Sequence, residues 1–270
     1  MDVSAYKAVL FDVDKTLTNS KREFPDANKR MLSDLVKNGF IVGLCTGRQS
    51  ATLQSVLSAF PEKSFHVICG GGQIITNGAQ VLKSWFIPEE TVKALVTLSS
   101  AHKCRLLLQY GSDLYGNEYA LEHASNFYLS DSTFILPKSL EHLPSFAESA
   151  LITVSNITDE LLSEVQKLSV PIKVMAGYSG TRYMDITAPG VTKATGVLEW
   201  CSLHGIQPSE VIGFGDSEND LEFLQTVGLS VAMGNAVEEL KTVADFVTED
   251  CDHDGVAVWI EKNVLSTLKG

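Results

Sequence analysis

Apolar runs of strand length alternate with amphipathic stretches of helix length near the start of the chain. The pattern predicts strands at residues 7–13, 40–45 and 66–69, and helices at residues 26–38 and from after residue 48 to about residue 59. The first helix places its apolar side chains on one face and ends at Gly39, since glycine commonly stops helices. This order of elements is typical of a parallel sheet with helices packed against it.

A β-hairpin is predicted directly after the third strand. Residues 73–76 and 79–85 are strand-like, and Asn77-Gly78 lies between them. Because Asn-Gly suits a tight two-residue turn, we expect the hairpin to turn at this dipeptide.

The end of the chain repeats the first pattern, whereas the middle does not. In the last quarter the pattern predicts helices at residues 193–204 and 221–227 and strands at residues 211–215 and 229–232. In the middle it predicts helices at about 89–101 and 158–168 among strand-like runs at residues 105–110, 150–155 and 172–176. We therefore predict one core domain, formed by residues 1–82 and 188–270, into which residues 83–187 are inserted as an α+β domain.

The composition describes a globular protein with an acidic surface. Of the 270 residues 44% are hydrophobic and 20% are charged, and 33 acidic against 21 basic residues give a net charge of −12. Such a chain is long enough to bury a core, and its surface repels nucleic acids and anionic membranes. A phosphate ester could therefore bind only where a metal ion or a few placed cations supply local positive charge.

The sequence favours a cytoplasmic protein, with a monomer as the default oligomeric state. No apolar run approaches the roughly 18 to 20 residues that span a bilayer, and the first residues lack the basic head and apolar body of a secretory signal. The five cysteines are scattered, with no Cys-x-x-Cys pair, which indicates reduced thiols rather than a zinc site or a disulfide framework.

Two carboxylates follow the first predicted strand. Asp12 and Asp14 lie two residues apart at its carboxyl end, and residues two apart on a strand point the same way. Ligands of open α/β sheets bind at this edge, and two neighbouring carboxylates favour a divalent cation. Taken alone, the pair fits a solvated turn equally well.

Three other segments place polar and charged side chains at the same edge of the sheet. They supply a hydroxyl and a cation after the second strand, a lysine at the start of a helix, and a polar cluster after a later strand: Thr46, Gly47 and Arg48; Lys193; and Asp216, Asn219 and Asp220. Acids that suit a metal ion and cations that suit a phosphate thus meet at one edge of the sheet. Chance is a poor explanation for all four segments together.

These four segments resemble the four motifs of the haloacid dehalogenase (HAD) superfamily. The residues that match motifs one to four are Asp12, Asp14 and Thr16; Thr46; Lys193; and Gly215, Asp216, Asn219 and Asp220. The insertion between motifs two and three resembles the C2 cap class, and residues 185–193 and 244–256 resemble the Cof-type subclass with a C2B cap. The resemblance implies an α/β fold: a Rossmann-like three-layer core with a parallel sheet, and an inserted α+β cap.

The resemblance also implies a reaction. Asp12 would attack phosphorus to form an aspartyl-phosphate, and Asp14 would protonate the leaving alcohol and later activate water. The cofactor would be Mg²⁺, held by Asp12, Asp14 and Asp216, because a cation lowers the repulsion between a carboxylate and a phosphate. The implied phosphate-binding residues are Val13, Thr46, Gly47, Lys193 and Asn219, and the implied supporting residues are Thr16, Arg48 and Asp220.

The chain departs from the family's pattern at two places. Lys15 stands where most relatives carry glycine, and Gly70-Gly71-Gly72 replaces the usual Asn-Gly-Ala after the third strand. An asparagine that would contact phosphate or substrate is therefore missing. In the insertion, Arg182 is our candidate for a substrate contact from the cap, with a surface salt bridge as the alternative.

Two other functions fit parts of the pattern. A phosphosugar mutase of the same superfamily shares these motifs, and a non-catalytic phosphate-binding sensor would also need an acidic pocket and a lysine. The presence of both Asp12 and Asp14 argues against the sensor, because binding alone does not need the second acid. We therefore expect a phosphoric monoester hydrolase, a Mg²⁺-dependent phosphatase of small phosphorylated metabolites, sugar phosphates first.

Overall fold

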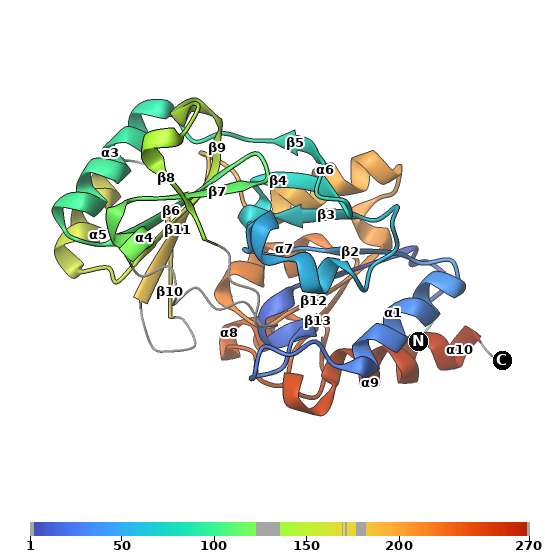
Figure 1. Ribbon diagram of the computed structural model, residues 1–270. Coiled ribbons are helices and arrows are strands. Elements are labelled where there is room, and N and C mark those ends of the chain that lie inside the picture. The colour runs from blue at the N-terminus through green and yellow to red at the C-terminus, as the bar shows by residue number, and fades with distance from the viewer. Residues whose placement is uncertain (1–2, 123–135, 169, 171, 177–181, 269–270) are drawn as a thin grey trace.

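Three β-sheets organise the chain (Figure 1). The computed structural model describes residues 3–122, 136–168, 170, 172–176 and 182–268. Within these residues the strands form one sheet of five strands, one of six and one of three. The first is built from both ends of the chain, and the second is built from its middle.

The five-stranded sheet is parallel, with the strand order β14-β13-β12-β1-β2. Its strands are β1 (Ala8–Phe11), β2 (Ile41–Leu44), β12 (Val211–Gly215), β13 (Leu229–Ala232) and β14 (Phe246–Val247). The central strands β1 and β12 are in register from Ala8 opposite Val211, and every residue of both is buried. Burial on both faces explains why these strands are continuous apolar runs rather than alternating ones.

Helices cover both faces of this sheet, as predicted for a three-layer core. Their bounds are α1 (Asp26–Lys37), α2 (Gln54–Leu57), α6 (Lys193–His204), α7 (Leu221–Thr226), α8 (Glu238–Val243), α9 (Gly255–Ile260) and α10 (Ser266–Leu268). Figure 1 shows α6 above the sheet and α1 and α9 below it. The helix predicted up to about residue 59 is shorter than expected, because only α2 and a single preceding turn, Ser50–Thr52, are helical there.

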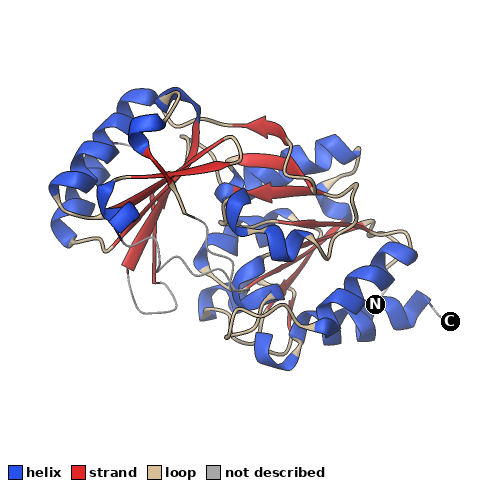
Figure 2. Ribbon diagram, in the orientation of Figure 1, coloured by secondary structure: helices blue, strands red, loops and turns tan. Residues whose placement is uncertain are grey.

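The six-stranded sheet forms a second unit and has the order β10-β11-β9-β6-β7-β8, antiparallel except for the pair β7 and β8. Its strands are β6 (Arg105–Tyr110), β7 (Asp113–Gly116), β8 (Lys138–Ser139), β9 (Ser149–Ser155), β10 (Ile172–Ala176) and β11 (Arg182–Ile186). Its helices are α3 (Glu89–Ala101), α4 (Glu118–Glu122) and α5 (Asp159–Val165). The helices α3 and α5 lie on its outer side, so the other face of the sheet is turned toward the parallel sheet (Figures 1 and 2).

The strand expected third in the parallel sheet belongs to a different sheet, which corrects the prediction. The three-stranded antiparallel sheet consists of β3 (Phe65–Ile68), β4 (Gln73–Thr76) and β5 (Val81–Ser84). Beside β2, β3 makes one isolated parallel bridge, between Cys45 and Val67. The His66 ring gives a physical reason: its Nδ1 lies 3.2 Å from Leu44 N and accepts the hydrogen bond that a backbone oxygen would otherwise accept.

The predicted hairpin is present, but its turn is longer than two residues. The loop between β4 and β5 runs from Asn77 to Gln80. Asn77 is anchored outside the turn, because its Nδ2 donates to Phe60 O at 3.2 Å and its Oδ1 lies 3.2 Å from His66 Nε2. The left-handed residue of the turn is Ala79, at φ +62°. The side chain of Asn77 therefore ties the turn to its neighbours instead of forming the tight turn.

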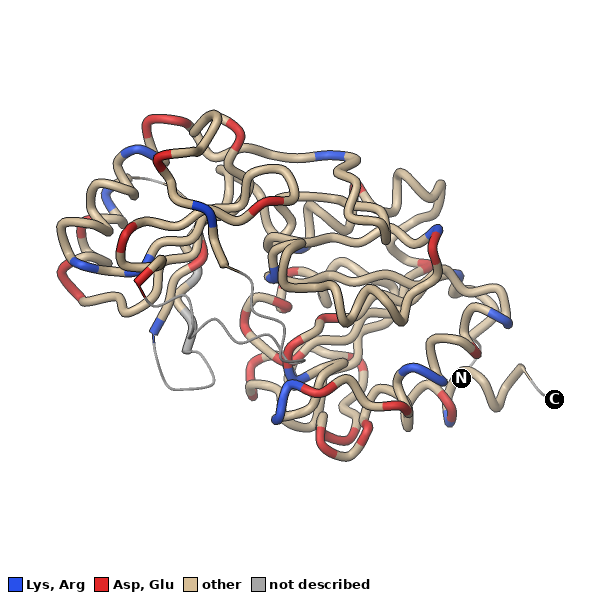
Figure 3. Tube along the Cα trace, in the orientation of Figure 1, with Lys and Arg blue, Asp and Glu red and all other residues tan. Residues whose placement is uncertain are grey.

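Charged residues are spread over both units (Figure 3). The 33 acidic residues outnumber the 21 basic ones, and Figure 3 shows both kinds on the outer helices and loops. None of the helices among the described residues combines the length and the apolar character that crossing a bilayer requires.

Candidate active site

A buried lysine connects two of the motif segments. Lys193 is the first residue of α6, and its side chain is 1% exposed. Its Nζ donates to Asp12 Oδ1 and to Asp220 Oδ1, both at 2.6 Å. Burial alone lowers the pKa of a lysine, but these two carboxylates raise the pKa of Lys193 above its ordinary value, so the ammonium is charged at neutral pH. The end of β1 and the segment after β12 are thus tied to the start of α6.

The start of α6 is fixed by its cap and by the glycine loop. Thr192 precedes the helix, and its backbone N–H donates to Thr195 Oγ1 at 2.9 Å. Gly71 packs so closely against this cap that a Cβ on it would overlap the Thr192 carbonyl oxygen, and its φ is +102°. Only glycine fits in this place. The loop Gly70–Gly72 therefore positions Lys193 through backbone packing.

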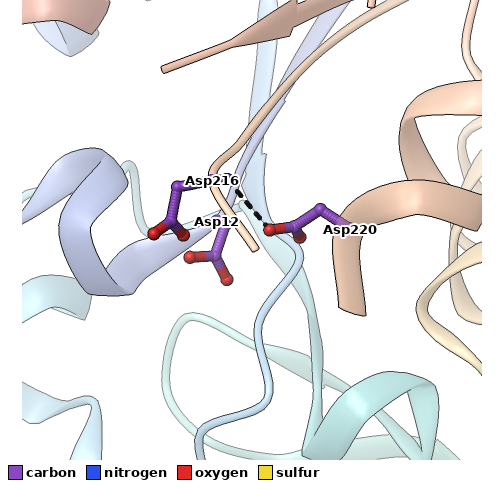
Figure 4. A group of neighbouring side chains, drawn as sticks. All are labelled: Asp12, Asp216 and Asp220. Carbon is purple, nitrogen blue, oxygen red and sulfur yellow. Dashed lines mark hydrogen bonds between the residues drawn. The ribbon is translucent and has the colours of Figure 1, made fainter. Parts of the chain in front are cut away.

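Three buried carboxylates lie close to one another (Figure 4). Carboxylate oxygens of Asp12, Asp216 and Asp220 lie within 4.8 Å of one another. Asp220 has both oxygens engaged, because Lys193 binds Oδ1 and the backbone N–H groups of Asp216 and Ser217 each donate to Oδ2 at 3.1 Å. Asp220 therefore orients Lys193, and Asp12 and Asp216 have oxygen atoms available for a ligand.

Burial and mutual repulsion disfavour charge on these two acids. Burial raises the pKa of Asp12 to about 7 and that of Asp216 to about 9, and neighbouring carboxylates add to the rise while Lys193 opposes it. A divalent cation relieves this repulsion, and carboxylate oxygens are donors that Mg²⁺ prefers. The residues present therefore fit a Mg²⁺ site to which Asp12 and Asp216 contribute.

Asp14 lies outside this trio and is bound by Arg48. Arg48 Nε and Nη2 donate to the two carboxylate oxygens of Asp14, each at 2.8 Å. Strand β1 ends one residue before Asp12, and residues 13–17 form a kinked helical turn with Lys15 at φ +57°. The expectation that Asp12 and Asp14 share a strand face was therefore wrong. Asp14 still contributes to the raised pKa of Asp12, which places its charge close by.

The other motif residues lie at the ends of the same strands. Thr46 is buried at the end of β2, where its Oγ1 accepts a hydrogen bond from Arg48 N at 3.1 Å. Gly47 follows, and a Cβ on Gly47 would lie 3.7 Å from Asn219 Nδ2. Thr16 is buried in the turn after β1, and its hydroxyl has no hydrogen-bond partner among the described residues. The strand ends thus bring these groups to one edge of the sheet.

Of three further residues named from the sequence, one is buried and two are exposed. Val13 is buried, and its carbonyl oxygen accepts hydrogen bonds from Thr18 N and Oγ1 at 2.9 and 3.0 Å. Lys15 is exposed. Arg182 is 45% exposed, and its Nη1 pairs with Asp159 Oδ1 at 2.7 Å. In this structure Arg182 therefore makes the surface salt bridge, the alternative that the sequence left open.

The structure adds two residues that sequence reasoning missed. Thr153 of β9 donates from Oγ1 to Asp185 Oδ1 of β11 at 2.6 Å. A Cβ on Gly47 would lie 3.7 Å from Asp185 Oδ2, so a carboxylate of the second unit reaches the end of β2. Burial raises the pKa of Asp185 to about 7, while Thr153 and Lys193 oppose the rise. The available signal was the alternation of polar and apolar residues at 182–186, which is typical of a half-buried strand.

Known proteins resemble the chain over nearly its whole length. The family model for haloacid dehalogenase-like hydrolase matches residues 9–260. The 5-amino-6-(5-phospho-D-ribitylamino)uracil phosphatase YcsE of Bacillus subtilis is 23% identical over 259 residues, which cover 96% of each chain. A phosphoglycolate phosphatase of Sulfolobus acidocaldarius is 28% identical over 265 residues, which cover 97% of this chain and 98% of that one. The solved structure of a HAD subclass IIB sugar phosphatase shares 25% identity and a TM-score of 0.78, and covers 95% of this chain and 98% of its own. These similarities therefore include both units, not the motif segments alone.

Proposed function

Because this chain belongs to the haloacid dehalogenase-like hydrolases, we propose that it is a Mg²⁺-dependent phosphatase of small phosphomonoesters, sugar phosphates first, and that the reaction passes through an aspartyl-phosphate on Asp12. The family and the named phosphatases among its relatives make it a phosphoric monoester hydrolase. The relatives named for a sugar phosphate and for a phospho-D-ribityl compound support substrates with several hydroxyl groups.

The observation that carries this proposal is the buried contact between Asp12 and Lys193. Lys193 Nζ binds Asp12 Oδ1 at 2.6 Å, and among the described residues no hydrogen bond reaches Oδ2. Oδ2 is therefore available to attack phosphorus, forming a new P–O bond while the bond to the leaving oxygen breaks. The ammonium beside the nucleophile offsets the negative charge of the phosphate, which a carboxylate alone would repel.

Asp14 is the proposed proton carrier. In the first half of the reaction it gives a proton to the leaving oxygen. In the second half it takes a proton from the water that attacks phosphorus, so that phosphate is released and the Asp12 carboxylate is restored. The two hydrogen bonds from Arg48 support this role because they fix the orientation of the Asp14 carboxyl group.

We propose that Asp12 and Asp216 hold the Mg²⁺, with Asp14 as the third ligand. The metal, when bound, supplies positive charge that reduces the repulsion between the Asp12 carboxylate and the phosphate dianion. As a metal ligand, Asp14 would share its carboxylate with Arg48, which donates hydrogen bonds to both of its oxygens. The residues proposed to bind the phosphate oxygens are Val13, Thr46, Gly47, Lys193 and Asn219, with Thr16, Arg48 and Asp220 supporting them.

Residues 83–187 are proposed to form the cap domain over a catalytic core of residues 1–82 and 188–270. Two contacts between the units support this division. Asp185 lies against Gly47, and Gln109 Nε2 of β6 donates to Ser50 Oγ, just after β2, at 3.0 Å. A cap in this position excludes water from the reacting groups and contacts the leaving group.

The proposed setting is the cytoplasm, with small phosphorylated metabolites as partners. All five cysteines are free and buried, which is the state expected in a reducing compartment. The net charge of −12 supports small-molecule partners over nucleic acids or anionic membranes.

The test is a panel of phosphate esters assayed with Mg²⁺ and with EDTA. We expect turnover with Mg²⁺ only, with sugar phosphates preferred, and complete loss of turnover and of any phosphorylated protein in Asp12→Asn. Asp34→Asn is the matched control, because Asp34 is a partly exposed acid of α1 that pairs with Lys37, and it should retain full activity.

Three other outcomes would contradict the proposal. Equal turnover in EDTA would remove the metal from the mechanism. Transfer of phosphate between positions of a hexose, dependent on a bisphosphate activator, would assign a mutase. Binding of a phosphate analogue without turnover of any ester would assign a sensor.

A further inference from the structure

Strand β11 has one face in the apolar interior of the cap and one face toward the proposed active site. Met184 and Ile186 pack with apolar side chains of α3, α5 and β9. Because side chains alternate along a strand, Tyr183 and Asp185 point to the opposite face. On that face a Cβ at Gly47 would lie 3.7 Å from Asp185 Oδ2. The cap thus brings a carboxylate to the end of β2, where phosphate binding is proposed.

One oxygen of this carboxylate is held in place, and the other is available. Thr153 Oγ1 donates to Asp185 Oδ1 at 2.6 Å, whereas no hydrogen bond reaches Oδ2 from the residues that the structure describes. Asn219 Nδ2 would lie at the same 3.7 Å from a Cβ on Gly47 as Asp185 Oδ2 does, so both groups lie near this glycine. An acceptor beside a phosphate site can bind a hydroxyl of the substrate.

The charges on this face favour an uncharged leaving group. Burial raises the pKa of the Tyr183 hydroxyl, the negative charges of Asp185, Asp14 and Asp12 raise it further, and Lys193 opposes the rise. Carboxylates of the core and of the cap therefore act on the same region. A second anionic group on the substrate would add to this negative charge, whereas a hydroxyl group would donate a hydrogen bond to it.

We propose that Asp185, oriented by Thr153, selects the leaving group of the substrate. It accepts a hydrogen bond from a hydroxyl near the scissile bond, and it rejects esters that carry a carboxylate or a second phosphate there. This inference rests on the proposed phosphatase activity and adds to it the chemical class of the leaving group, an uncharged polyol.

The test compares three esters at about pH 8, where the Asp185 carboxyl, with its pKa of about 7, is mostly ionised. The esters are sorbitol 6-phosphate, p-nitrophenyl phosphate and 2-phosphoglycolate. Asp185→Asn keeps the shape of the side chain and removes its charge. Relative to the aryl ester, we expect its kcat/KM to fall about 10- to 100-fold for sorbitol 6-phosphate and to rise at least about fivefold for 2-phosphoglycolate.

Two further variants make the result specific. Thr153→Val removes the hydroxyl that holds Asp185, and it should shift both ratios in the same direction by a smaller factor. Asp113→Asn is the matched control, because Asp113 is a cap acid that pairs with Lys138 and is 49% exposed. It should change neither ratio.

The outcomes separate this inference from the proposed function. A wild-type chain that hydrolyses none of the three esters overturns the proposed function. Hydrolysis of all three, with ratios unchanged in both Asp185→Asn and Thr153→Val, overturns only the selection by Asp185. An equal loss of kcat/KM for every ester in either variant also overturns it, because a uniform loss assigns Asp185 a structural role.

Discussion

At the scale of single residues, the two aspartates that we propose to be catalytic differ in the cation that binds each of them. Asp12 meets the ammonium of Lys193 through one oxygen, whereas Asp14 meets the guanidinium of Arg48 through both. A two-point bond of this kind is among the stronger ion pairs, and it fixes the orientation of the Asp14 carboxyl group. Asp14 is therefore held in one orientation for the two proton transfers that we propose, one in each half of the reaction.

This difference predicts separate effects on the two halves of the reaction. In Asp14→Asn, formation of phosphoenzyme from p-nitrophenyl phosphate should be largely retained, because nitrophenolate leaves without a proton. Hydrolysis of the phosphoenzyme still needs a base and should slow by about 10²–10⁴-fold. Rapid quenching should then show a burst of one nitrophenolate per chain, and mass spectrometry should show a phosphoryl group on Asp12. A phosphoryl group on wild-type Asp14 would reverse the two roles.

The raised pKa values of Asp12 and Asp216 predict how pH acts on the stability of the metal-free protein. An unfolded aspartate has a pKa of about 3.9, whereas the folded values are about 7 for Asp12 and about 9 for Asp216. Between the unfolded and folded values the folded state binds more protons, so the free energy of unfolding falls as pH rises. Buried His66, with its pKa lowered to about 4, acts in the opposite direction below about pH 6.5. Calorimetry in EDTA should therefore show a Tm that decreases from about pH 7 to about pH 9.

Mg²⁺ should reverse this trend. The ion replaces the protons on these carboxyl groups, so its binding strengthens as pH rises. The increase in Tm on adding Mg²⁺ should therefore grow from about pH 5 to about pH 9, and Asp216→Asn should reduce that increase at every pH. An increase in Tm that is the same at all pH values, or that survives Asp216→Asn unchanged, would place the ion elsewhere.

At the scale of elements, the start of α6 depends on the glycine loop. A Cβ on Gly71 would overlap the backbone of Thr192, the residue before Lys193, whereas Gly205 at the other end of the helix has nothing within 4 Å. Both glycines have positive φ, +102° and +65° respectively. The two glycines therefore have similar backbone conformations, but only Gly71 lacks space for a Cβ atom.

Gly71→Ala should reduce both stability and activity. We expect the free energy of unfolding to fall by about 2–4 kcal/mol and kcat/KM to fall at least about tenfold, because the shifted helix start displaces Lys193. Gly205→Ala should lower stability by about 1 kcal/mol and leave kcat/KM unchanged. Urea denaturation and steady-state kinetics measure both effects, and equal losses of kcat/KM in the two variants would show that α6 does not position Lys193 in this way.

The elements that sequence patterns predicted best are those with local signals. The strands at 211–215 and 229–232 and the helix at 193–204 have the predicted bounds. A continuous apolar run identifies a strand buried on both faces, and Gly205 marks the helix end. The sheet to which β3 belongs was not predictable in this way, because β3 pairs fully with β4 and makes one isolated bridge beside β2.

The same distinction applies to the candidate site. The motif residues follow strand ends or, for Lys193, begin a helix, so their approach to one edge of the sheet was predictable from the sequence. The approach of Asp185 to Gly47 could not, because it depends on how the sheets of the two units pack against each other. The Arg48 contact that separates Asp14 from the carboxylate trio also arises only in three dimensions.

At the scale of the whole molecule, the net charge of −12 opposes the approach of a dianionic ester. Salt screens this repulsion, so kcat/KM for a phosphomonoester should rise about two- to threefold between about 10 and 200 mM NaCl at constant Mg²⁺. The value of kcat, measured at saturating substrate, should stay constant. A kcat/KM that falls with salt would mean that positive charge near the site dominates the approach of substrate.

The chain order of the parallel sheet has a consequence for biosynthesis. The central neighbours β1 and β12 are joined through Ala8 and Val211, roughly two hundred residues apart. During synthesis, the edge of β1 that pairs with β12 stays unpaired until β12 has left the ribosome. Unpaired strand edges of this kind favour aggregation. The strands of the cap all emerge before β12 does. The two chain segments that connect the cap to the core both contact the loop Gly70–Gly72. Trp85 N donates to Gly72 O at 3.0 Å, and Thr187 lies next to Gly70. If the cap folds first, it brings its two connections together, so the effective loop between β1 and β12 is shorter. This lowers the entropy cost of pairing β12 with β1.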